Sequence, residues 1–231
     1  MKLSDRMFMV ASLVKPGKVL ADIGCDHGYL SVWIVREGIA GRCISMDLRE
    51  GPLAQAEKNI RFFHQEERIE TRLSDGMNKL AAGEADRIVI AGMGGILMAD
   101  ILERGRLCVA GAGQLVLQPQ SDVALVRRKV HALGFRITDE KTCFEDGKYY
   151  VAFACEPGAE DEPYSDAEYI YGRILSGKRD EVHRAFLEKE LAKNRRMLQE
   201  LEKAETESSG QRIGSVRKRT EQLLLLLGLY D

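Results

Sequence analysis

The sequence predicts an α/β fold that is doubly wound around a mostly parallel sheet of seven strands, followed by a small all-α, coiled-coil-like hairpin. Three observations predict this fold. Short apolar runs rich in β-branched residues alternate with amphipathic helical patterns from residue 18 to about 155, the last two runs are joined by a tight turn, and leucines with heptad-like spacing fill the C-terminal part. We therefore expect a sheet domain at residues 1–156, a linker at 157–163 and a helical domain at 164–231.

The strand and helix patterns follow one another in the order that a parallel sheet requires. The expected strands are 18–23, 42–47, 69–73, 87–91, 114–118, 136–140 and 149–155, and the expected helices among them are 29–38, 52–64, 96–104 and 121–133. Repeats of strand, helix and strand form right-handed crossovers, as in Rossmann-like folds. Between the last two strands Glu145-Asp146-Gly147-Lys148 predicts a hairpin turn, so one strand should run antiparallel.

Helices are also expected at both ends of the chain. The first should begin near Ser4 or Asp5 and end at Pro16-Gly17. Beyond the acidic linker, one helix is expected near 165–176, and two longer ones with a break around 208–210. Their seams consist of Leu187, Leu191, Asn194, Leu198 and Leu201, and of Ile213, Val216, Thr220, Leu223 and Leu227. Such a seam is first of all the core of an antiparallel hairpin, so we expect a monomer, with a dimer through the leucines as the alternative.

Composition excludes several classes of protein. With 34 Lys and Arg against 36 Asp and Glu, the net charge of −2 rules out a polycation that coats nucleic acid indiscriminately. The five cysteines are scattered and never form a C-x-x-C pair, which indicates free thiols in a reducing cytoplasm and no zinc site. The apolar run Leu223–Leu227 is too short to span a bilayer. We expect a cytoplasmic protein without a bound metal or a membrane partner.

A glycine-rich turn follows the first strand, where open α/β sheets bind their ligands. It reads Asp22-Ile23-Gly24-Cys25-Asp26-His27-Gly28. A dinucleotide site uses G-x-G-x-x-G to bring bare backbone N–H groups to a pyrophosphate, whereas here three residues, one of them acidic, separate Gly24 from Gly28. Because S-adenosylmethionine carries a sulfonium and an ammonium group, the acidic turn fits this methyl donor better than it fits NAD.

Acidic residues also close the next two strands. Asp47 stands where a carboxylate would accept hydrogen bonds from both ribose hydroxyls. In Ser74-Asp75-Gly76-Met77, Asp75 would accept from the adenine amino group and Met77 would pack on the ring. Each feature alone is equally consistent with a helix cap or an ordinary turn. Their occurrence at three successive strand ends favours the cofactor site.

Further motifs support a more specific assignment. They are Leu3-Ser4-Asp5-Arg6, the first turn through Leu30, Ile90-Ala91-Gly92-Met93-Gly94-Gly95, Leu117-Gln118-Pro119-Gln120 and Glu145-Asp146-Gly147-Lys148-Tyr149. In this set the chain resembles the bacterial tRNA N1-methyltransferases that act on adenine at position 22. The resemblance implies a class I methyltransferase domain with a helical C-terminal domain, S-adenosylmethionine as cofactor, S-adenosylhomocysteine as product and tRNA as partner. This sequence departs from the family at Gln120, where the family often has Asn. Both side chains carry an amide, so the departure changes only how far that amide reaches.

Together, the strand ends and the resemblance predict the cofactor-binding residues. They are Asp22, Gly24, His27, Gly28, Tyr29, Asp47, Leu48, Ser74, Asp75, Gly76, Ala91, Gly92 and Met93. Adenine N1 is neutral and has an in-plane lone pair, so no strong base is needed, and an acceptor near N6 would stabilise the positive charge of the product. Asp26 is the candidate for this catalytic role, and the alternative is that it caps the following helix.

A base that is methylated at N1 must leave its pair, so the enzyme also needs contacts to the RNA outside the base itself. The expected substrate-binding residues are Arg6, Gln118, Arg127, Arg128, Arg195 and Arg196. Gln118 would read an adenine edge, and the arginines would contact phosphates. The alternative for each basic pair is a solvated helix face. Two other functions remain open from the sequence: a methyltransferase for another RNA or a small molecule, and a non-catalytic adaptor that binds the cofactor and a protein.

Overall fold

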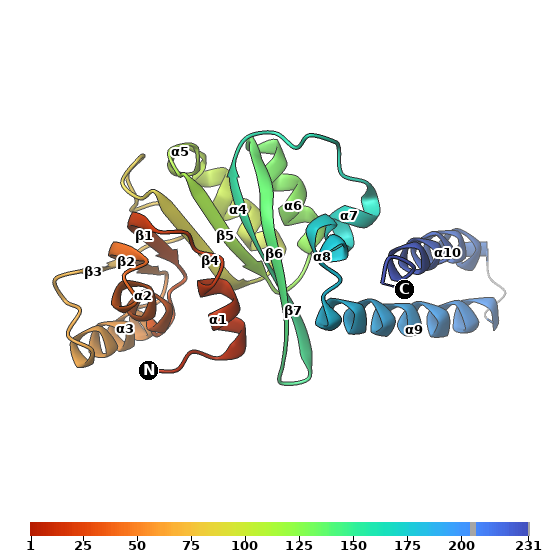
Figure 1. The fold of residues 1–231 in the computed structure, drawn as a ribbon, viewed down its shortest axis with the longest axis horizontal. Helices are drawn as coiled ribbons and strands as arrows, with labels where there is room; N and C mark the ends of the chain where they lie inside the picture. Colours follow the sequence, from red (N-terminus) through yellow and green to blue (C-terminus); the bar gives the residue numbers. More distant parts are fainter. Residues whose placement is uncertain (204–206, 231) are drawn as a thin grey trace. The chain divides into compact units, whose positions relative to one another are not determined.

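The computed structural model describes residues 1–203 and 207–230, and of residues 207–211 the backbone alone (Figure 1). Its contacts divide the chain into two compact units, Met1–Glu162 and Pro163–Asp231.

A seven-stranded sheet forms the centre of the first unit, in the order β3-β2-β1-β4-β5-β7-β6. The strands are β1 (Gly17–Ile23), β2 (Ala40–Asp47), β3 (Ile69–Leu73), β4 (Arg87–Met93), β5 (Gln114–Pro119), β6 (Phe135–Glu145) and β7 (Lys148–Pro157). All neighbouring pairs are parallel except those of β7, which runs antiparallel to both β5 and β6. The predicted fold class is confirmed. Strand order reverses between β1 and β4, which is where such sheets bind ligands.

The hairpin of β6 and β7 is much longer than the sequence pattern predicts. It pairs continuously from Phe135 with Pro157 to Glu145 with Lys148, apart from a register shift between Ile137 and Asp139. The last pair with β5 joins Leu117 to Phe153, so the tip of the hairpin extends beyond the end of β5. Because β6 runs in the direction of β5, the tip projects from the carboxyl edge of the sheet.

Six helices accompany the sheet within the described residues of this unit. They are α1 (Asp5–Ala11), α2 (Tyr29–Arg36), α3 (Glu50–Phe62), α4 (Gly95–Arg104), α5 (Arg106–Ala110) and α6 (Val123–Ala132). The Ser4 hydroxyl caps α1 by accepting from the Met7 amide at 3.3 Å, as expected. The one-turn helix α5 was not predicted, because a turn between two glycines has too few residues for a periodic pattern.

Buried apolar side chains of α1 and α2 form a core with the central strands. Val10, Ala11, Val32 and Val35 are fully buried in it.

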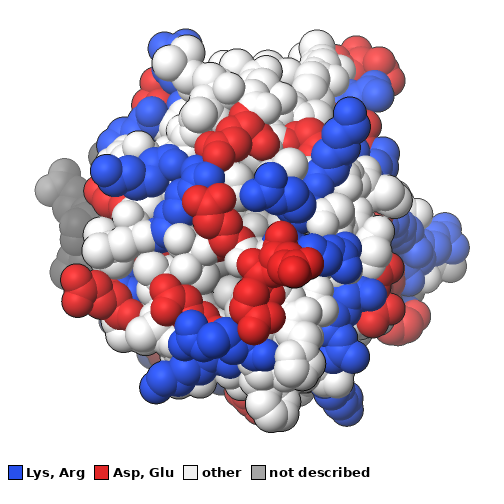
Figure 2. Space-filling view, turned by 90° about the vertical axis from the view of Figure 1, so that its left-hand side faces the viewer, with Lys and Arg blue, Asp and Glu red and all other residues white. Residues whose placement is uncertain are grey.

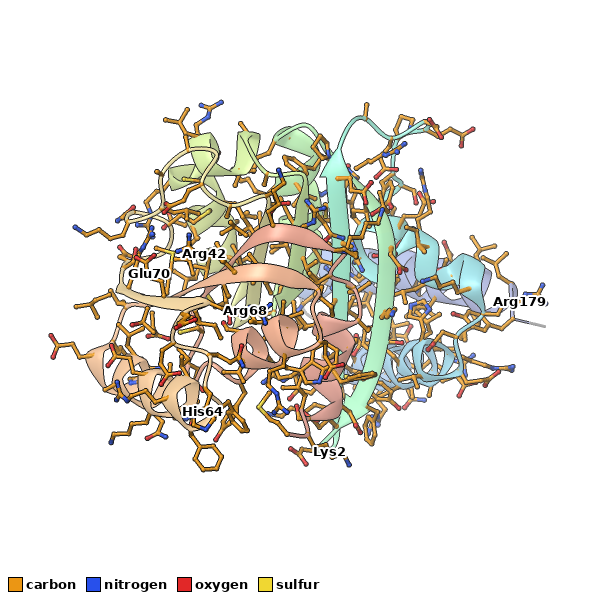
Figure 3. All side chains as sticks on the ribbon, turned by 60° about the vertical axis from the view of Figure 1, so that its left-hand side comes forward. Lys2, Arg42, His64, Arg68, Glu70 and Arg179 are labelled. Carbon is orange, nitrogen blue, oxygen red and sulfur yellow. The ribbon has the colours of Figure 1, made fainter. Side chains whose placement is uncertain are left out.

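Gln114 connects the segment after α1 to the start of β5, since its amide donates to the Leu13 carbonyl and accepts from the Lys15 amide, both at 2.9 Å. At the β3 edge of the sheet, Arg68, just before β3, donates to the carbonyls of residues 40 and 41 and so links β3 to β2 (Figure 3).

The second unit is entirely helical where the structure describes it. Its helices are α7 (Asp166–Tyr171), α8 (Arg173–Lys178), α9 (Glu181–Lys203) and α10 (Glu207–Leu227). The single helix expected near 165–176 is wrong, because Gly172 has a φ of 95° and separates two short helices. The predicted break at 208–210 is also wrong, since α10 already begins at Glu207.

The predicted seam does form the interface of α9 and α10. Leu187, Leu191, Asn194, Val216 and Leu223 are its buried positions. His183, near the start of α9, lies with Nδ1 2.5 Å from the Tyr230 hydroxyl beyond the end of α10, and its Nε2 donates to the Tyr171 carbonyl at 2.9 Å. Because the start of α9 lies beside the end of α10, the two helices run antiparallel. Among the described residues, no helix has the length and apolarity that crossing a membrane requires.

Candidate active site

A cavity of about 550 Å³ opens at the carboxyl ends of β1 to β4. Its wall combines the turn after β1, the ends of the next three strands, and side chains of α1 and α4. The lining residues are Arg6, Met7, Asp22, Ile23, Gly24, Cys25, Asp26, His27, Tyr29, Leu30, Asp47, Leu48, Arg49, Ser74, Asp75, Gly76, Ala91, Gly92, Met93, Leu97, Ile101 and Gln120. Of the thirteen predicted cofactor-binding residues, only Gly28 lies outside this wall.

Asp22, at the end of β1, is an ionisable group almost without solvent contact, with an exposed fraction of 3%. The Ser31 hydroxyl donates to its Oδ2 at 2.6 Å and accepts in turn from Ser45 at 2.7 Å. Burial, which the Ser31 hydrogen bond partly offsets and the nearby Asp47 charge reinforces, raises the pKa of Asp22 to about 6. Among the described residues no cation pairs with this carboxylate, so the cavity is suited to a ligand with a positive group.

Asp47 and Asp26 are joined across the cavity wall. The Asp26 amide donates to Asp47 Oδ2 at 3.1 Å, and the Arg49 amide donates to Oδ1 at 2.9 Å, which holds the buried Asp47 carboxylate in place. Asp47 does not cap α3, whose N-cap is Arg49. These contacts leave acceptor capacity on both oxygens.

Asp26 has a left-handed backbone, with φ 49°, and its side chain is 60% exposed. Its carboxylate oxygens lie 3.7 Å from His27 Nε2 and 4.0 Å from Arg49 Nη2. The N-cap of α2 is Gly28, which makes no side-chain cap, so the alternative in which Asp26 caps this helix is wrong. The carboxylate is therefore available to the cavity.

Glycines bring backbone close to the cavity. Gly24 has φ 76°, and a side chain there would collide with Met93 Cε. Gly92 has φ 79°, and a Cβ added there would lie 3.4 Å from Arg6 Nη1 and 3.9 Å from Gln120 Nε2. Gly28, also at positive φ, packs instead on Ala56 of α3, where an added Cβ would come within 3.0 Å. The predicted cofactor contact of Gly28 is thus replaced by a role in helix packing.

The turn after β3 differs in part from expectation. Ser74 donates to the Gly76 carbonyl at 3.0 Å and shapes the turn. The Asp75 carboxylate lines the cavity but also receives two hydrogen bonds from Arg104, at 2.9 and 3.2 Å. Met77 points away from the cavity, is buried, and packs against Gly105, so the prediction that it packs on an adenine ring is wrong.

Exposed side chains surround the opening. Tyr29 and Leu48 keep 45% and 65% of their surface exposed, although both line the cavity. The sequence reasoning missed Leu97 and Ile101 of α4, which add an apolar wall. Their spacing of four residues on a helix that begins right after the Gly92 loop was an available signal.

Arg6 and Gln118 do not lie where the sequence analysis places them. Arg6 is not outside the pocket but in its wall, where its Nη1 donates to Gln118 Oε1 at 2.9 Å. Gln118 is fully buried and does not face the cavity, so its predicted contact with an adenine edge is wrong. Gln120, two residues later, occupies the lining position instead.

The remaining predicted arginines are distributed over both units. Arg127 is fully buried and ion-paired with Glu140, so its predicted contact with phosphate is wrong. Arg128 on α6 and Arg195 and Arg196 on α9 are exposed. On the face shown in Figure 2, basic and acidic side chains are intermixed, as the near-zero net charge leads one to expect.

Comparisons with known proteins agree with this geometry. Residues 3–153 match a family model described as a methyltransferase domain. The tRNA (adenine(22)-N(1))-methyltransferase of Bacillus subtilis is 32% identical over 228 residues, which cover 96% of each chain.

Solved structures agree along the whole chain as well. The B. subtilis m1A22 tRNA methyltransferase TrmK has a TM-score of 0.90 and 31% identity, covering 98% of this chain and 99% of that one. A Streptococcus pneumoniae protein in complex with S-adenosyl-L-methionine has a TM-score of 0.87 and 30% identity, covering 98% and 100%. With a matching domain model and a relative of this identity over nearly its full length, the chain belongs to the methyltransferase-domain family and, within it, to the tRNA (adenine(22)-N(1))-methyltransferases.

Proposed function

We propose that this protein transfers a methyl group from S-adenosylmethionine to N1 of adenine 22 in tRNA and releases S-adenosylhomocysteine. The observation that carries the proposal is Asp22, a buried carboxylate in the cavity wall whose pKa is raised to about 6 and which no described cation neutralises. The ammonium group of the cofactor would supply the missing charge. The membership in the family and the bound S-adenosyl-L-methionine of the S. pneumoniae relative support the same ligand.

The other strand ends fit the rest of the cofactor. Asp47 would accept from the ribose hydroxyls with the lone pairs that its two backbone donors leave available. Leu48 and Leu97 offer apolar surface at the opening for an adenine ring, and Asp75 offers an acceptor already oriented by Arg104. Bound S-adenosylmethionine supplies an electrophilic methyl group, so these residues have only to hold it.

Catalysis by the chain itself would be a matter of orientation and charge. Adenine N1 needs no proton removed before it attacks, and holding it in line with the methyl group can contribute roughly 7–11 kcal/mol in the best cases. As the ring becomes cationic, the Asp26 carboxylate would stabilise the positive charge near N6. The exposure of Asp26, its place in the wall and its absence from the α2 cap support this role.

We propose that the two parts of the chain divide the work. Residues 1–156 would bind the cofactor and the target adenine, residues 157–163 would link the parts, and residues 164–231 would contact the tRNA at a distance. The exposed Arg128, Arg195 and Arg196 are suited to phosphate contacts of this kind. We further propose a monomer, because half of the predicted seam positions of α9 and α10 are buried within one chain. We also propose a cytoplasmic location, where tRNA is found and where the free thiols of this chain would stay reduced.

The test is methyl transfer from labelled S-adenosylmethionine to unmodified bacterial tRNA, followed by nucleoside analysis. We expect labelled 1-methyladenosine, which disappears when adenine 22 is replaced. Label in 1-methyladenosine that survives this replacement would reject the position, and label on another RNA would reject the substrate. Cofactor binding without transfer to any RNA would favour a non-catalytic adaptor.

A further inference from the structure

Four segments that are distant in the sequence meet at the side chain of Arg6. Its guanidinium donates to Gln118 Oε1 at 2.9 Å, and its Nε lies 4.0 Å from a Glu145 carboxylate oxygen. Its Cζ stands 5.5 Å from the centre of the Tyr150 ring. Gly92 completes the group, because its amide donates to the same Gln118 oxygen at 3.2 Å.

Gln118 is the residue that fixes this arrangement. It is fully buried at the end of β5, and all of its polar atoms are engaged, since its Nε2 donates to the Pro119 carbonyl at 3.1 Å. The orientation of the amide is set by chemistry, because an arginine and a backbone N–H can only donate. One oxygen therefore holds both the Arg6 fork and the loop after β4 in fixed positions.

The Arg6 guanidinium is only partly used by these contacts. An arginine has five side-chain N–H donors, and among the described residues only Gln118 accepts a hydrogen bond from them. The Glu145 carboxylate accepts instead from the Arg6 backbone amide, at 3.2 Å. Since Arg6 lines the cavity, its remaining donors are available to a ligand.

The chemistry of the reaction decides which ligand group this is. The target adenine becomes cationic on methylation, so a guanidinium in contact with the ring would oppose the transition state. An anion is the suitable partner, and a guanidinium fork matches the oxygens of a phosphate. The acidic anchors for the cofactor, Asp22 and Asp47, lie at the ends of β1 and β2. Arg6 is held instead at the end of β5 by Gln118, whose oxygen also accepts from Gly92 of β4.

We propose that Arg6 binds a phosphodiester group flanking the target adenosine and that Gln118 is a positioning residue that acts through Arg6. The proposal rests on the proposed function and names the part of the RNA that the cavity wall holds. An already oriented guanidinium loses little conformational freedom when the phosphate arrives, which makes the contact stronger than one from a freely moving side chain.

A double-mutant cycle tests the positioning role. Gln118→Met removes the acceptor but keeps the length of the side chain, and we expect it to lower kcat/KM for tRNA by about tenfold or more in the Arg6 protein. In an Arg6→Ala background the same change should lower it by much less. Gln118→Glu keeps an acceptor for Arg6 and Gly92 but loses the donor to the Pro119 carbonyl, so it should be more active than Gln118→Met and less active than the wild type. An equal loss in both backgrounds would show that Gln118 acts independently of Arg6 and would overturn the proposal.

Gln114→Met is the matched control. Gln114 is also a buried glutamine of β5 with backbone partners on both sides, but it lies at the other end of the strand, away from the cavity. We expect Gln114→Met to lower the melting temperature as Gln118→Met does, while kcat/KM per folded molecule stays at the wild-type value. An equal drop in kcat/KM for both variants would mean that general loss of packing explains the effect.

A synthetic tRNA with a neutral methylphosphonate beside adenosine 22 tests the phosphate. We expect this substitution to reduce kcat/KM about 10- to 100-fold with the wild-type protein and little with Arg6→Ala. Equal losses with both proteins would overturn the proposal. A fall in S-adenosylhomocysteine affinity on Arg6→Ala as large as the fall in kcat/KM would instead assign Arg6 to the cofactor carboxylate. If the wild-type protein forms no 1-methyladenosine on ordinary tRNA, the proposed function itself has failed, a result that is separate from any of these.

Discussion

Arg127 and Glu140 form an ion pair that is closed off from solvent on all sides. Arg127 Nε donates to Glu140 Oε1 at 2.9 Å, Nη2 lies 2.8 Å from the same oxygen, and both side chains have an exposed fraction of 0%. The guanidinium also lies over the Phe153 ring, 5.4 Å from its centre. The pair joins α6 to β6 and, through the ring, to β7.

We expect Arg127→Met to destabilise the protein by about 3–5 kcal/mol, because it leaves the Glu140 carboxylate buried without its partner. Thermal unfolding would measure this. The double variant with Glu140→Leu should recover most of the loss, and Arg128→Met, at the exposed neighbouring position, should change the melting temperature little. Weaker tRNA binding by Arg127→Met without loss of stability would contradict this assignment.

The raised pKa of Asp22 predicts a pH dependence of cofactor affinity. Above pH 6 the carboxylate is ionised and attracts the ammonium group, and below pH 6 it is increasingly protonated. Calorimetric titration with S-adenosylhomocysteine from pH 8 to 5 should show affinity falling by up to tenfold per pH unit below about 6. Asp22→Asn should bind weakly and without this dependence. A wild-type affinity that stays constant to pH 5 would be incompatible with the predicted contact.

The same shift predicts the effect of Asp22 on the protein without ligand. Its folded-state pKa, about 6, lies above the ordinary value of 3.8 expected for the unfolded chain, so the folded state holds the proton more tightly and the stability from this group is lost as pH rises through about 6. Asp22→Asn should therefore be more stable than the wild type at pH 8, with a free energy of unfolding higher by on the order of 2–3 kcal/mol at most and a correspondingly higher melting temperature. The difference should shrink towards pH 4. A destabilised variant at pH 8 would show that the Ser31 contact outweighs burial.

A comparison of Gly24→Ala with Gly38→Ala separates the effect of backbone strain from the effect of disturbing the cofactor site. Both have positive φ, 76° and 70°, but a Cβ at Gly24 meets Met93 while one at Gly38 meets nothing within 4 Å. Each alanine variant should lose about 1–2 kcal/mol from the left-handed backbone. Only Gly24→Ala should also weaken S-adenosylhomocysteine binding, and equal binding by the two variants would argue against backbone contact at Gly24.

Asp26→Asn should leave cofactor affinity nearly unchanged and lower kcat by about 10- to 100-fold, because asparagine tolerates the left-handed backbone but cannot offset a positive charge. Single-turnover methylation of tRNA at saturating cofactor would measure the effect. His27→Gln, next to it in the chain, serves as the comparison for general disturbance of the turn. A variant with wild-type kcat would remove Asp26 from the catalytic role.

The site residues whose positions the sequence predicted correctly are those at the carboxyl ends of strands. Asp22, Asp47 and Ser74 follow recognisable β patterns, and parallel strands bring their carboxyl ends to one edge, so one motif predicts the position of the next. The family motif Ile90-Ala91-Gly92-Met93-Gly94-Gly95 predicted that Ala91 to Met93 belong to the site, and they lie in the wall. Periodicity likewise predicted the seam of α9 and α10.

The errors came from contacts between segments that no local pattern encodes. Arg127 follows Val126 on the face of α6 that also carries Val130, but its burial depends on Glu140, which the register shift between Ile137 and Asp139 turns to the inner face of β6. Gln118 was correctly placed at the end of β5, yet its inward orientation depends on Arg6, 112 positions earlier. Charge and hydropathy alone could not distinguish these residues from exposed ones.

The attachment of α1 also sets an order of assembly during synthesis. Arg6 is synthesised before both of its side-chain partners, because Gln118 follows it by 112 residues and Glu145, whose carboxylate accepts from the Arg6 amide, by 139. In contrast, the strand ends that carry Asp22, Asp47 and Ser74 have all been synthesised once half of this unit has been made. The wall formed by the ends of β1 to β3 can therefore assemble before the wall that contains Arg6, which needs the β6–β7 hairpin to have been made.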